Sequence, residues 1–464
     1  MQRFPERAQA EPELVARHFE EAGSAEPAID WYRRAGERAV DRSANAEAIH
    51  HLTRALGLVE GLPEGAERIS QELALCLSLG RPLSVARGFG SPEVERLYLR
   101  ARELGARAGD GPEYGMALYG LNVVYVTRAQ LDASCELAQD VLRVAEARSD
   151  PFLLAAGHYQ LAIARYLKGE PARALEHAEQ ARALDAEGEK ASMMGGLFAA
   201  DDLRVVARLW GAWAAWLHGL PDTAVHLSRD ALARARESAN PFSTAYALAW
   251  SSVVHMMRRE REPARLLGDE AVAEEGEQDF PMPLGVGRLI GIWARTLPGL
   301  ERDVQDAQMA EAQQALIGLG QTGVQAAVPQ ILGGLAEGRL IFERFDEAIA
   351  LADAALGVSA ATGQPYWDAD LHRIKGQALL RRDVSAGAEG ERLLRRAVEI
   401  ARGQGARSLE LRAALPLCRL LHERGESDQA RSLLSGVYGS FSEGFESGDL
   451  RDARALLDQL ASAK

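Results

Sequence analysis

Five tryptophans occur at spacings that could place them on one surface of a helical protein. Trp210, Trp213 and Trp216 recur at every third residue of one apolar segment, and Trp250 and Trp293 follow at intervals close to 40 residues. Tryptophan joins a large apolar surface to an N–H donor and is enriched at the energetic centres of protein interfaces. The same spacing is equally typical of an apolar stripe buried in a core. The pattern therefore leaves open a partner-binding surface and a structural core.

The candidate binding surface comprises seven residues that combine apolar area with polar tips. They lie in what we expect to be the inner helices of the middle of the chain, roughly residues 119–293, and are Tyr119, Asn122, Tyr159, Arg208, Trp250, His255 and Trp293. If these side chains form an exposed concave wall, a partner must cover them, because large apolar patches seldom stay in contact with water. If they are buried between helices instead, they are core residues, and truncating them would mainly lower stability.

Residue patterns that carry enzyme chemistry are missing from the sequence. There is no GxxxxGK[ST] phosphate loop, no HExxH zinc motif and no GxSxG nucleophile elbow. His50 and His51 are adjacent, and adjacent residues on a helix point in different directions and do not readily share a metal ion. The glycine cluster at residues 285–291 has the wrong spacing for a dinucleotide loop. We therefore expect no catalytic activity, no metal and no cofactor.

Charge, cysteine content and apolar runs limit the partners and the cellular location that we expect for this protein. The net charge is −14, which disfavours a surface designed for nucleic-acid phosphates. The three cysteines, Cys76, Cys135 and Cys418, lie too far apart in the sequence for a metal motif, and we expect them to be reduced thiols. The chain opens without a signal-peptide pattern, and its longest apolar run, residues 209–217, is about half a membrane span. We expect a cytoplasmic protein with no nucleic-acid or membrane partner.

A sequence repeat of about 40 residues indicates which helices position these side chains. An alanine near the start of a predicted second helix occurs at residues 133, 174, 224, 264, 307, 348, 388 and 430, at intervals of 40 to 43 residues except for one of 50. A second series consists of prolines at predicted helix starts, at residues 112, 151, 241, 281 and 365. Proline suits the first helical turn because an N–H there has no intrahelical partner. Two markers with one period predict stacked helical hairpins.

These signals predict an all-α, tetratricopeptide-like solenoid wound as a right-handed superhelix. Residues 1–110 form a less regular helical region, and residues 111–436 form an array of about eight hairpins. Residues 437–464 hold a capping helix. The one long interval contains residues 186–200, which we interpret as an insertion. Because one hairpin cannot bury both of its faces, each depends on its neighbours.

Specific segments resemble the C-terminal repeat region of bacterial AAA/STAND-type signalling ATPases, including cyclase-linked and transcriptional-regulator-linked members. The resemblance rests on residues 3–6 (RFPE), 12–19 (PELVARHF), 28–39 (AIDWYRRAGERA), 43–49 (SANAEAI), 88–94 (GFGSPEV) and 437–445 (VYGSFSEGF). In that family the first of these segments follows a nucleotide-binding module. The resemblance therefore implies that this chain corresponds to the repeat region, and that residues 1–110 adjoin an ATPase module absent from it.

Two functions follow as expectations. The first is a non-catalytic interaction and regulatory module, whose concave groove meets a protein or peptide partner and which controls an ATPase or cyclase module. The second is a sensor in which the superhelix closes around a small-molecule effector. An aromatic-lined enclosed cavity favours the sensor, whereas an open, charged groove favours peptide binding.

Overall fold

The computed structural model describes residues 11–109, 111–184, 202–238, 240–274, 280–383 and 387–462, and the regular elements within these ranges are helices. The first five helices are α2 (Pro12–Glu21), α3 (Ala25–Asp41), α4 (Asn45–Glu60), α5 (Ala66–Arg87) and α6 (Pro92–Ala108). The next eight are α7 (Pro112–Thr127), α8 (Leu131–Arg148), α9 (Pro151–Leu167), α10 (Pro171–Ala183), α12 (Leu203–His218), α13 (Pro221–Glu237), α14 (Pro241–Met257) and α15 (Arg261–Ala273). The last nine are α16 (Pro281–Arg295), α17 (Arg302–Gln321), α18 (Val328–Ile341), α19 (Phe345–Thr362), α20 (Asp368–Arg382), α21 (Gly387–Gln404), α22 (Arg407–Glu423), α23 (Ser427–Tyr438) and α24 (Gly448–Ser462).

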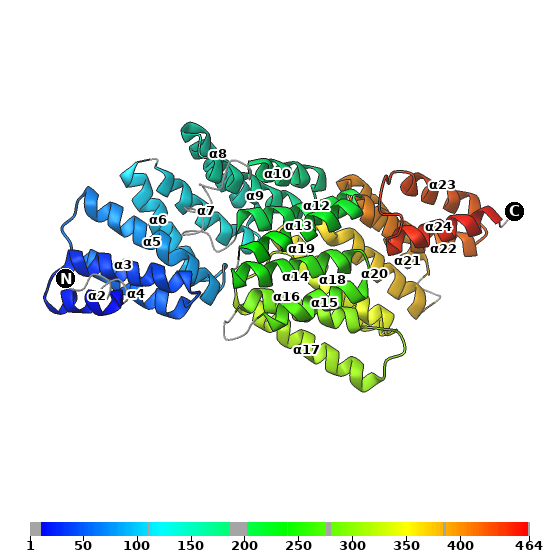
Figure 1. The fold of residues 1–464 in the computed structure, drawn as a ribbon. Helices are drawn as coiled ribbons and strands as arrows, with labels where there is room; N and C mark the ends of the chain where they lie inside the picture. The colour runs from blue at the N-terminus through cyan, green and yellow to red at the C-terminus, as the bar shows by residue number, and fades with distance from the viewer. Residues whose placement is uncertain are drawn as a thin grey trace.

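Consecutive helices pack as hairpins, and each hairpin packs against the next (Figure 1). From α7 to α23 the pairs are α7/α8, α9/α10, α12/α13, α14/α15, α16/α17, α18/α19, α20/α21 and α22/α23. The structure confirms the predicted fold class, an all-α tetratricopeptide-like solenoid. The expected insertion at residues 186–200 lies outside the described residues, and the division of the chain into three regions stays a prediction.

Helix starts follow the proline series that the sequence contains. Helices α7, α9, α14 and α16 begin at Pro112, Pro151, Pro241 and Pro281, and a short 3₁₀ turn begins at Pro365. Two of these helices are also capped by the residue before the proline. The Asp150 carboxylate accepts from the Leu153 N–H at 3.0 Å, and the Asn240 side chain accepts from the Ser243 N–H at 3.1 Å. Such caps satisfy backbone donors that the first turn leaves free.

Small residues allow the helices of each hairpin to approach closely. The alanines at the five clearest repeat positions, 174, 224, 264, 348 and 430, are fully buried. At the weaker positions the predicted alanine is not the buried one. Ala307 and Ala388 are exposed, and neighbouring small residues such as Ala312 and Gly390 are buried in their helices instead.

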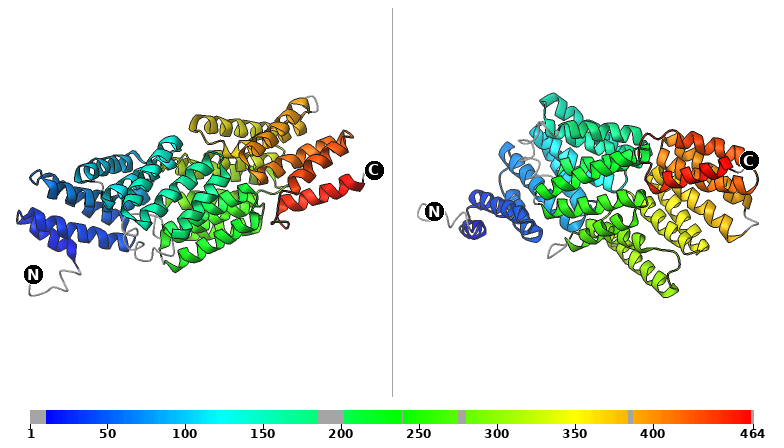
Figure 2. Two further views of the ribbon diagram at one scale, coloured as in Figure 1. Left: turned by 90° about the horizontal axis from the view of Figure 1, so that it is seen from above. Right: turned by 45° about the vertical axis from the view of Figure 1, so that its right-hand side comes forward.

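The superhelix closes on itself, so that its second half packs against its first. The Ser408 hydroxyl donates to the Trp216 carbonyl across 192 residues of sequence, and Tyr166 and Tyr366 place their ring centroids 4.8 Å apart. Helices α12 and α22 are in contact. Figure 2 shows α18, α19 and α20 lying behind the helices from α12 to α16. The inner face of the first turn is therefore covered by the same chain.

Two sets of polar contacts hold the turns together. Near the C-terminus, Glu443 accepts hydrogen bonds from the backbone N–H groups of Asp222 and Thr223 at 2.9 and 2.7 Å. Deeper inside, Arg412 pairs with Asp449 at 2.7 Å, and Arg259 bridges Asp449 and Glu337 at 3.3 and 3.1 Å.

Buried carboxylates in this network stay ionised. Burial raises the pKa of Asp449, but the guanidinium groups of Arg259 and Arg412 more than offset it and hold that pKa below its usual range. A buried ion pair of this kind is costly to break, because breaking it leaves an uncompensated charge.

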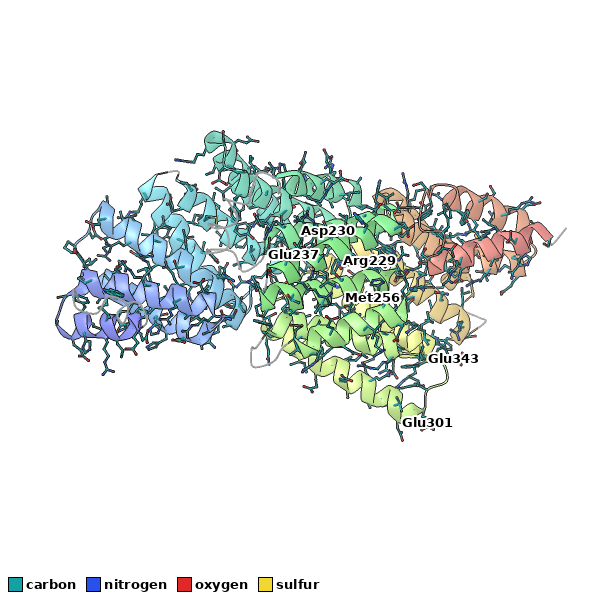
Figure 3. The ribbon with its side chains drawn as sticks, in the orientation of Figure 1. Arg229, Asp230, Glu237, Met256, Glu301 and Glu343 are labelled. Carbon is teal, nitrogen blue, oxygen red and sulfur yellow. The ribbon has the colours of Figure 1, made fainter. Side chains whose placement is uncertain are left out.

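Helix α17 extends furthest from the body of the solenoid, with Glu301 at its outer end, whereas Met256 lies among the central helices (Figure 3). The exposed apolar residues of α17 include Val304 and Ile317. In the part of the chain that the structure describes, every helix is too short or too polar to cross a membrane.

Candidate functional site

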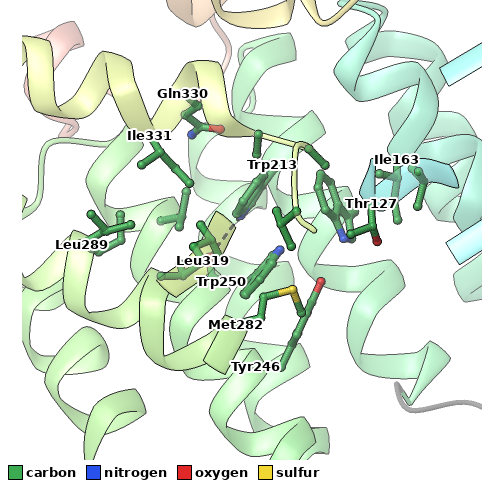
Figure 4. A pocket seen from close by; sticks show the side chains of 18 of the residues that line it. Thr127, Ile163, Trp213, Tyr246, Trp250, Met282, Leu289, Leu319, Gln330 and Ile331 are labelled. Atoms are coloured by element: carbon green, nitrogen blue, oxygen red, sulfur yellow. Dashed lines mark hydrogen bonds between the residues drawn. The ribbon is translucent and has the colours of Figure 1, made fainter. Parts of the chain in front are cut away.

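The axis of the closed superhelix contains an apolar cavity of about 100 Å³ (Figure 4). Residues of the first turn, from α7, α9, α12, α14 and α16, form one wall, and the segment from Val324 to Leu335 closes the other side. The aromatic residues that line it are Phe89, Tyr159, Trp210, Trp213, Tyr246, Trp250 and Trp293. Such a cavity is the usual form of a small-molecule site, which is concave, mostly apolar and lined by a few polar groups.

A stack of aromatic rings forms the wall on α12 and α14. The rings of Tyr246 and Trp250 are nearly parallel, with centroids 3.9 Å apart, and Trp250 is inclined by only 11° to Trp213 at 6.2 Å. The Trp213 indole N–H donates to the Trp250 carbonyl at 3.2 Å, which fixes the two helices relative to each other. The stack therefore presents a flat aromatic surface beside the cavity.

Gln330 supplies a polar group from the opposite wall. Its Oε1 accepts hydrogen bonds from the hydroxyls of Tyr366 at 3.3 Å and Tyr166 at 3.5 Å. Burial raises the pKa of both tyrosines well above its usual value, so both hydroxyls keep their protons and need an acceptor. This requirement fixes the amide orientation and turns Nε2 away from the tyrosines.

The segment between α17 and α18 is held in place by backbone contacts to the first turn. The N–H groups of Gln325 and Ala326 both donate to the Thr127 carbonyl at 2.9 Å. The Gly90 N–H donates to the Thr322 carbonyl at 3.2 Å. A Cβ on Gly90 would lie 2.4 Å from the carbonyl oxygen of Gly323, so only glycine permits this approach. The wall of the cavity thus depends on the closure of the superhelix.

Three of the seven predicted surface residues line this cavity. They are Tyr159, Trp250 and Trp293, which are 4, 7 and 4% exposed. The expectation of an exposed concave wall is not what the structure shows, because the second turn of the superhelix covers that wall. The three side chains instead face the cavity between the two turns.

The other four predicted residues do not line the cavity and make polar contacts between helices or within a turn. Asn122 donates to Gln160 at 2.8 Å, and Tyr119 accepts through its backbone carbonyl from Gln160. Arg208 pairs with Asp230. These contacts position α7, α9, α12 and α13.

His255 contacts Glu260 at 2.6 Å between ring Nδ1 and carboxylate. Burial raises the pKa of Glu260, but the hydrogen bond to His255 and the charge of Arg258 outweigh it and lower that pKa. His255 therefore anchors the turn between α14 and α15.

Sequence reasoning missed residues that come from the second turn. Gln330 and the segment 324–327 contribute to the cavity only because the superhelix closes, and no local pattern marks them. Trp210 and Trp213 were noticed for their spacing, and the cavity includes both. Their neighbour Trp216 stacks on Trp367 at 6.0 Å, outside the cavity.

A second, polar cleft lies on the far side of Trp293. It is lined by Arg259, Arg261, Glu337 and Arg373, among others. The Arg261 guanidinium lies 4.7 Å from the centre of the Trp293 ring and donates to the Trp293 carbonyl at 2.8 Å. Among the described residues, no group of three or more histidines, cysteines or acids is placed to hold a metal ion.

Sequence comparisons find one longer relative of this chain. No protein-family profile matches the sequence. An uncharacterized protein of Rhizobium meliloti (strain 1021) is 25% identical over 410 residues, which are 86% of this chain and 38% of that protein. The chain thus spans about two fifths of the length of the curated relative it matches.

Solved structures resemble the fold at low sequence identity. A Rap protein in complex with the competence and sporulation factor has a TM-score of 0.57 and 11% identity, over 81% of this chain and 98% of that one. Yeast Tom70 covers 98% of this chain and 96% of its own at a TM-score of 0.36 and 14% identity. The packing of consecutive helices as hairpins and the likeness to the Rap protein show that the chain has a tetratricopeptide-like, all-helical repeat fold, and that likeness supports the fold alone.

Proposed function

We propose that this chain is a non-catalytic regulatory module of a longer signalling protein. The fold provides a scaffold of stacked hairpins, which in general offers extended surfaces for protein partners without catalytic residues. The sequence resemblance to AAA/STAND-type ATPases suggests a nucleotide-binding or cyclase module as the partner, in the same polypeptide or another. The Rhizobium relative, much longer than the matched segment, is consistent with such an arrangement.

The partner is tested most simply in that relative. Deleting the matched 410-residue segment should change the rate of ATP hydrolysis or cyclisation by the remaining protein, because a regulatory module biases its partner's equilibrium. The chain described here, purified alone with ATP and Mg²⁺, should release no phosphate above background. Turnover that survives repurification, and is lost in a point variant of this chain, would contradict a non-catalytic role.

A second candidate function, an effector sensor, is favoured by one observation: the cavity is built by both turns of the closed superhelix. A small molecule bound there contacts Trp250 on one turn and Gln330 on the other. It would stabilise the closed form by about 2.7 kcal/mol at a concentration 100 times its Kd. The effector would then change the affinity of a partner that prefers the open or the closed form. Such a change is coupling between two sites.

Hydrogen exchange tests the sensor. A bound effector should slow exchange of the Gln325 and Ala326 amides, which bond to Thr127 across the two turns. A molecule that binds without slowing them does not act by closing the superhelix.

A further inference from the structure

We infer that the cavity binds an uncharged, flat and largely apolar molecule that carries a hydrogen-bond acceptor. The inference rests on the effector site of the proposed function and specifies the chemistry of its ligand. It follows from three features of the wall: no charged side chain, a flat aromatic surface, and buried N–H donors that have no acceptor.

The absence of charge comes first. All of the residues that line the cavity are apolar or aromatic, except for Thr127, Gln160, Gln330 and the glycine at 334. An ionised ligand would be transferred from water to a site without a counter-charge, which costs far more than the burial of a neutral group. The ligand must therefore be neutral where it is buried.

Three buried hydrogen-bond donors of the wall are unpaired within the described structure. The Nε1 atoms of Trp210 and Trp250 and the Nε2 atom of Gln330 have no hydrogen-bond partner among the described residues. The three side chains are 6, 7 and 2% exposed, and buried donors of this kind are nearly always paired in folded proteins. Indole and amide N–H groups can only donate, so an acceptor on a ligand would satisfy them.

The amide oxygens of Gln330 and Gln160 and the backbone carbonyl of Trp250 already accept hydrogen bonds. Gln330 Oε1 accepts from Tyr166 and Tyr366, and Gln160 Oε1 accepts from Asn122 at 2.8 Å. The Trp250 carbonyl accepts from the Trp213 indole. A ligand that offers only donors would therefore find these acceptors occupied, whereas a carbonyl or ether oxygen would find donors.

Size and shape limit the ligand further. The cavity volume of about 100 Å³ is of the order of the apolar cavity of about 150 Å³ that binds benzene. The Trp250 ring lies flat against Tyr246, with Met282 beside it, as Figure 4 shows. The donor nitrogens are covered by neighbouring side chains, so an indole must rotate slightly as the ligand enters. A single aromatic ring with one carbonyl matches the flat wall and its donors. Because the cavity is smaller than the one that binds benzene, side chains of the wall must move outward to admit it.

Three probes of nearly equal shape test the inference by isothermal titration with the full chain. Acetophenone is neutral with an acceptor, α-methylstyrene replaces its oxygen by a methylene group, and benzoate adds a negative charge. We expect acetophenone to bind one to one and benzoate to bind at least tenfold more weakly. In Trp250→Phe, which replaces the indole with a smaller aromatic ring and removes the N–H, the affinity for acetophenone should fall about fivefold. The affinity for α-methylstyrene should change less than twofold.

Trp213→Phe is the matched control. Its indole lines the same cavity, but its N–H already donates a hydrogen bond to the Trp250 carbonyl. This variant should change the affinities for acetophenone and α-methylstyrene by the same factor. If Trp250→Phe does not fold, Trp210→Phe removes another unpaired donor and takes its place.

Several outcomes would overturn the inference. They are failure of all three probes to bind folded protein, equal losses of acetophenone and α-methylstyrene in Trp250→Phe, and benzoate binding as tightly as acetophenone. The last result would point to the arginines beyond Trp293. The partner experiment on the Rhizobium relative uses no small molecule, so it can succeed or fail independently of these titrations.

Discussion

Gly90→Ala probes whether the closure of the superhelix depends on one close backbone approach. An added Cβ would lie 2.4 Å from the Gly323 carbonyl oxygen and 2.7 Å from its carbonyl carbon. Both are backbone atoms that cannot rotate away, so the segment between α17 and α18 must shift. Overpacking of this kind costs about 1–3 kcal/mol. Alanine also restricts the unfolded chain more than glycine does, and this effect offsets about 0.4–1 kcal/mol of the lost stability.

We therefore expect Gly90→Ala to lower stability by about 1–2 kcal/mol in urea denaturation, with faster exchange of the Gln325 and Ala326 amides. Gly318→Ala is the matched control, because it lies in the nearby helix α17 and its Cβ would meet nothing within 4 Å. That change should raise stability by about 0.5–1 kcal/mol through helix propensity. If Gly90→Ala is as stable as the original protein and leaves those amides unchanged, closure does not depend on this contact.

Three further predictions follow from buried groups. Arg412→Leu should cost about 3–5 kcal/mol, because it removes a buried partner of Asp449; a loss within 0.5 kcal/mol in denaturation would contradict the role of the network. Burial lowers the pKa of His158 and His177, so folding favours their neutral forms, and stability should fall as pH drops below the unfolded value of about 6.5. His158→Gln should flatten that slope in melting curves between pH 7 and 5, and an unchanged slope would refute this. Burial raises the pKa of the Cys418 thiol to about 12, so it should react with a disulfide reagent only after unfolding; rapid reaction in the native protein would be inconsistent.

Much of the fold was accessible from the sequence because its signals are local and repeated. The prolines at residues 112, 151, 241 and 281 mark helix starts, since the preceding residue and the first helical turn decide them. The clearest alanines mark close contacts between helices. The weaker alanines do not mark such contacts: Ala388 is exposed, while Gly390 lies where a Cβ would meet the Gly376 carbonyl oxygen at 3.0 Å. Any small residue serves at such a contact, so alanine alone does not define its register.

The site was only partly accessible, because it depends on how far the superhelix winds. The helical spacing of Trp210 and Trp213, and the recurrence at Trp250 and Trp293, placed aromatic residues on the inner face. Whether that face stays open is decided by contacts such as Ser408 with Trp216, between residues far apart in sequence. A single sequence carries no local mark of such contacts.

The polar residues among the candidates show a different limit. Asn122 and Arg208 resemble interface residues by type, but each completes a hydrogen bond or ion pair between neighbouring helices. Residue type alone does not separate a buried polar contact from a binding contact. The partner on a neighbouring helix, in these cases Gln160 and Asp230, is what distinguishes them.

The central claim is that the space between the two turns is a ligand site. A crystal structure of the chain soaked with acetophenone tests it most directly. The account predicts the ring against Trp250, with its oxygen about 2.7–3.2 Å from an indole nitrogen of Trp210 or Trp250 or from Gln330 Nε2. Acetophenone bound only outside this cavity, or an empty cavity in crystals grown at saturating probe, would contradict it.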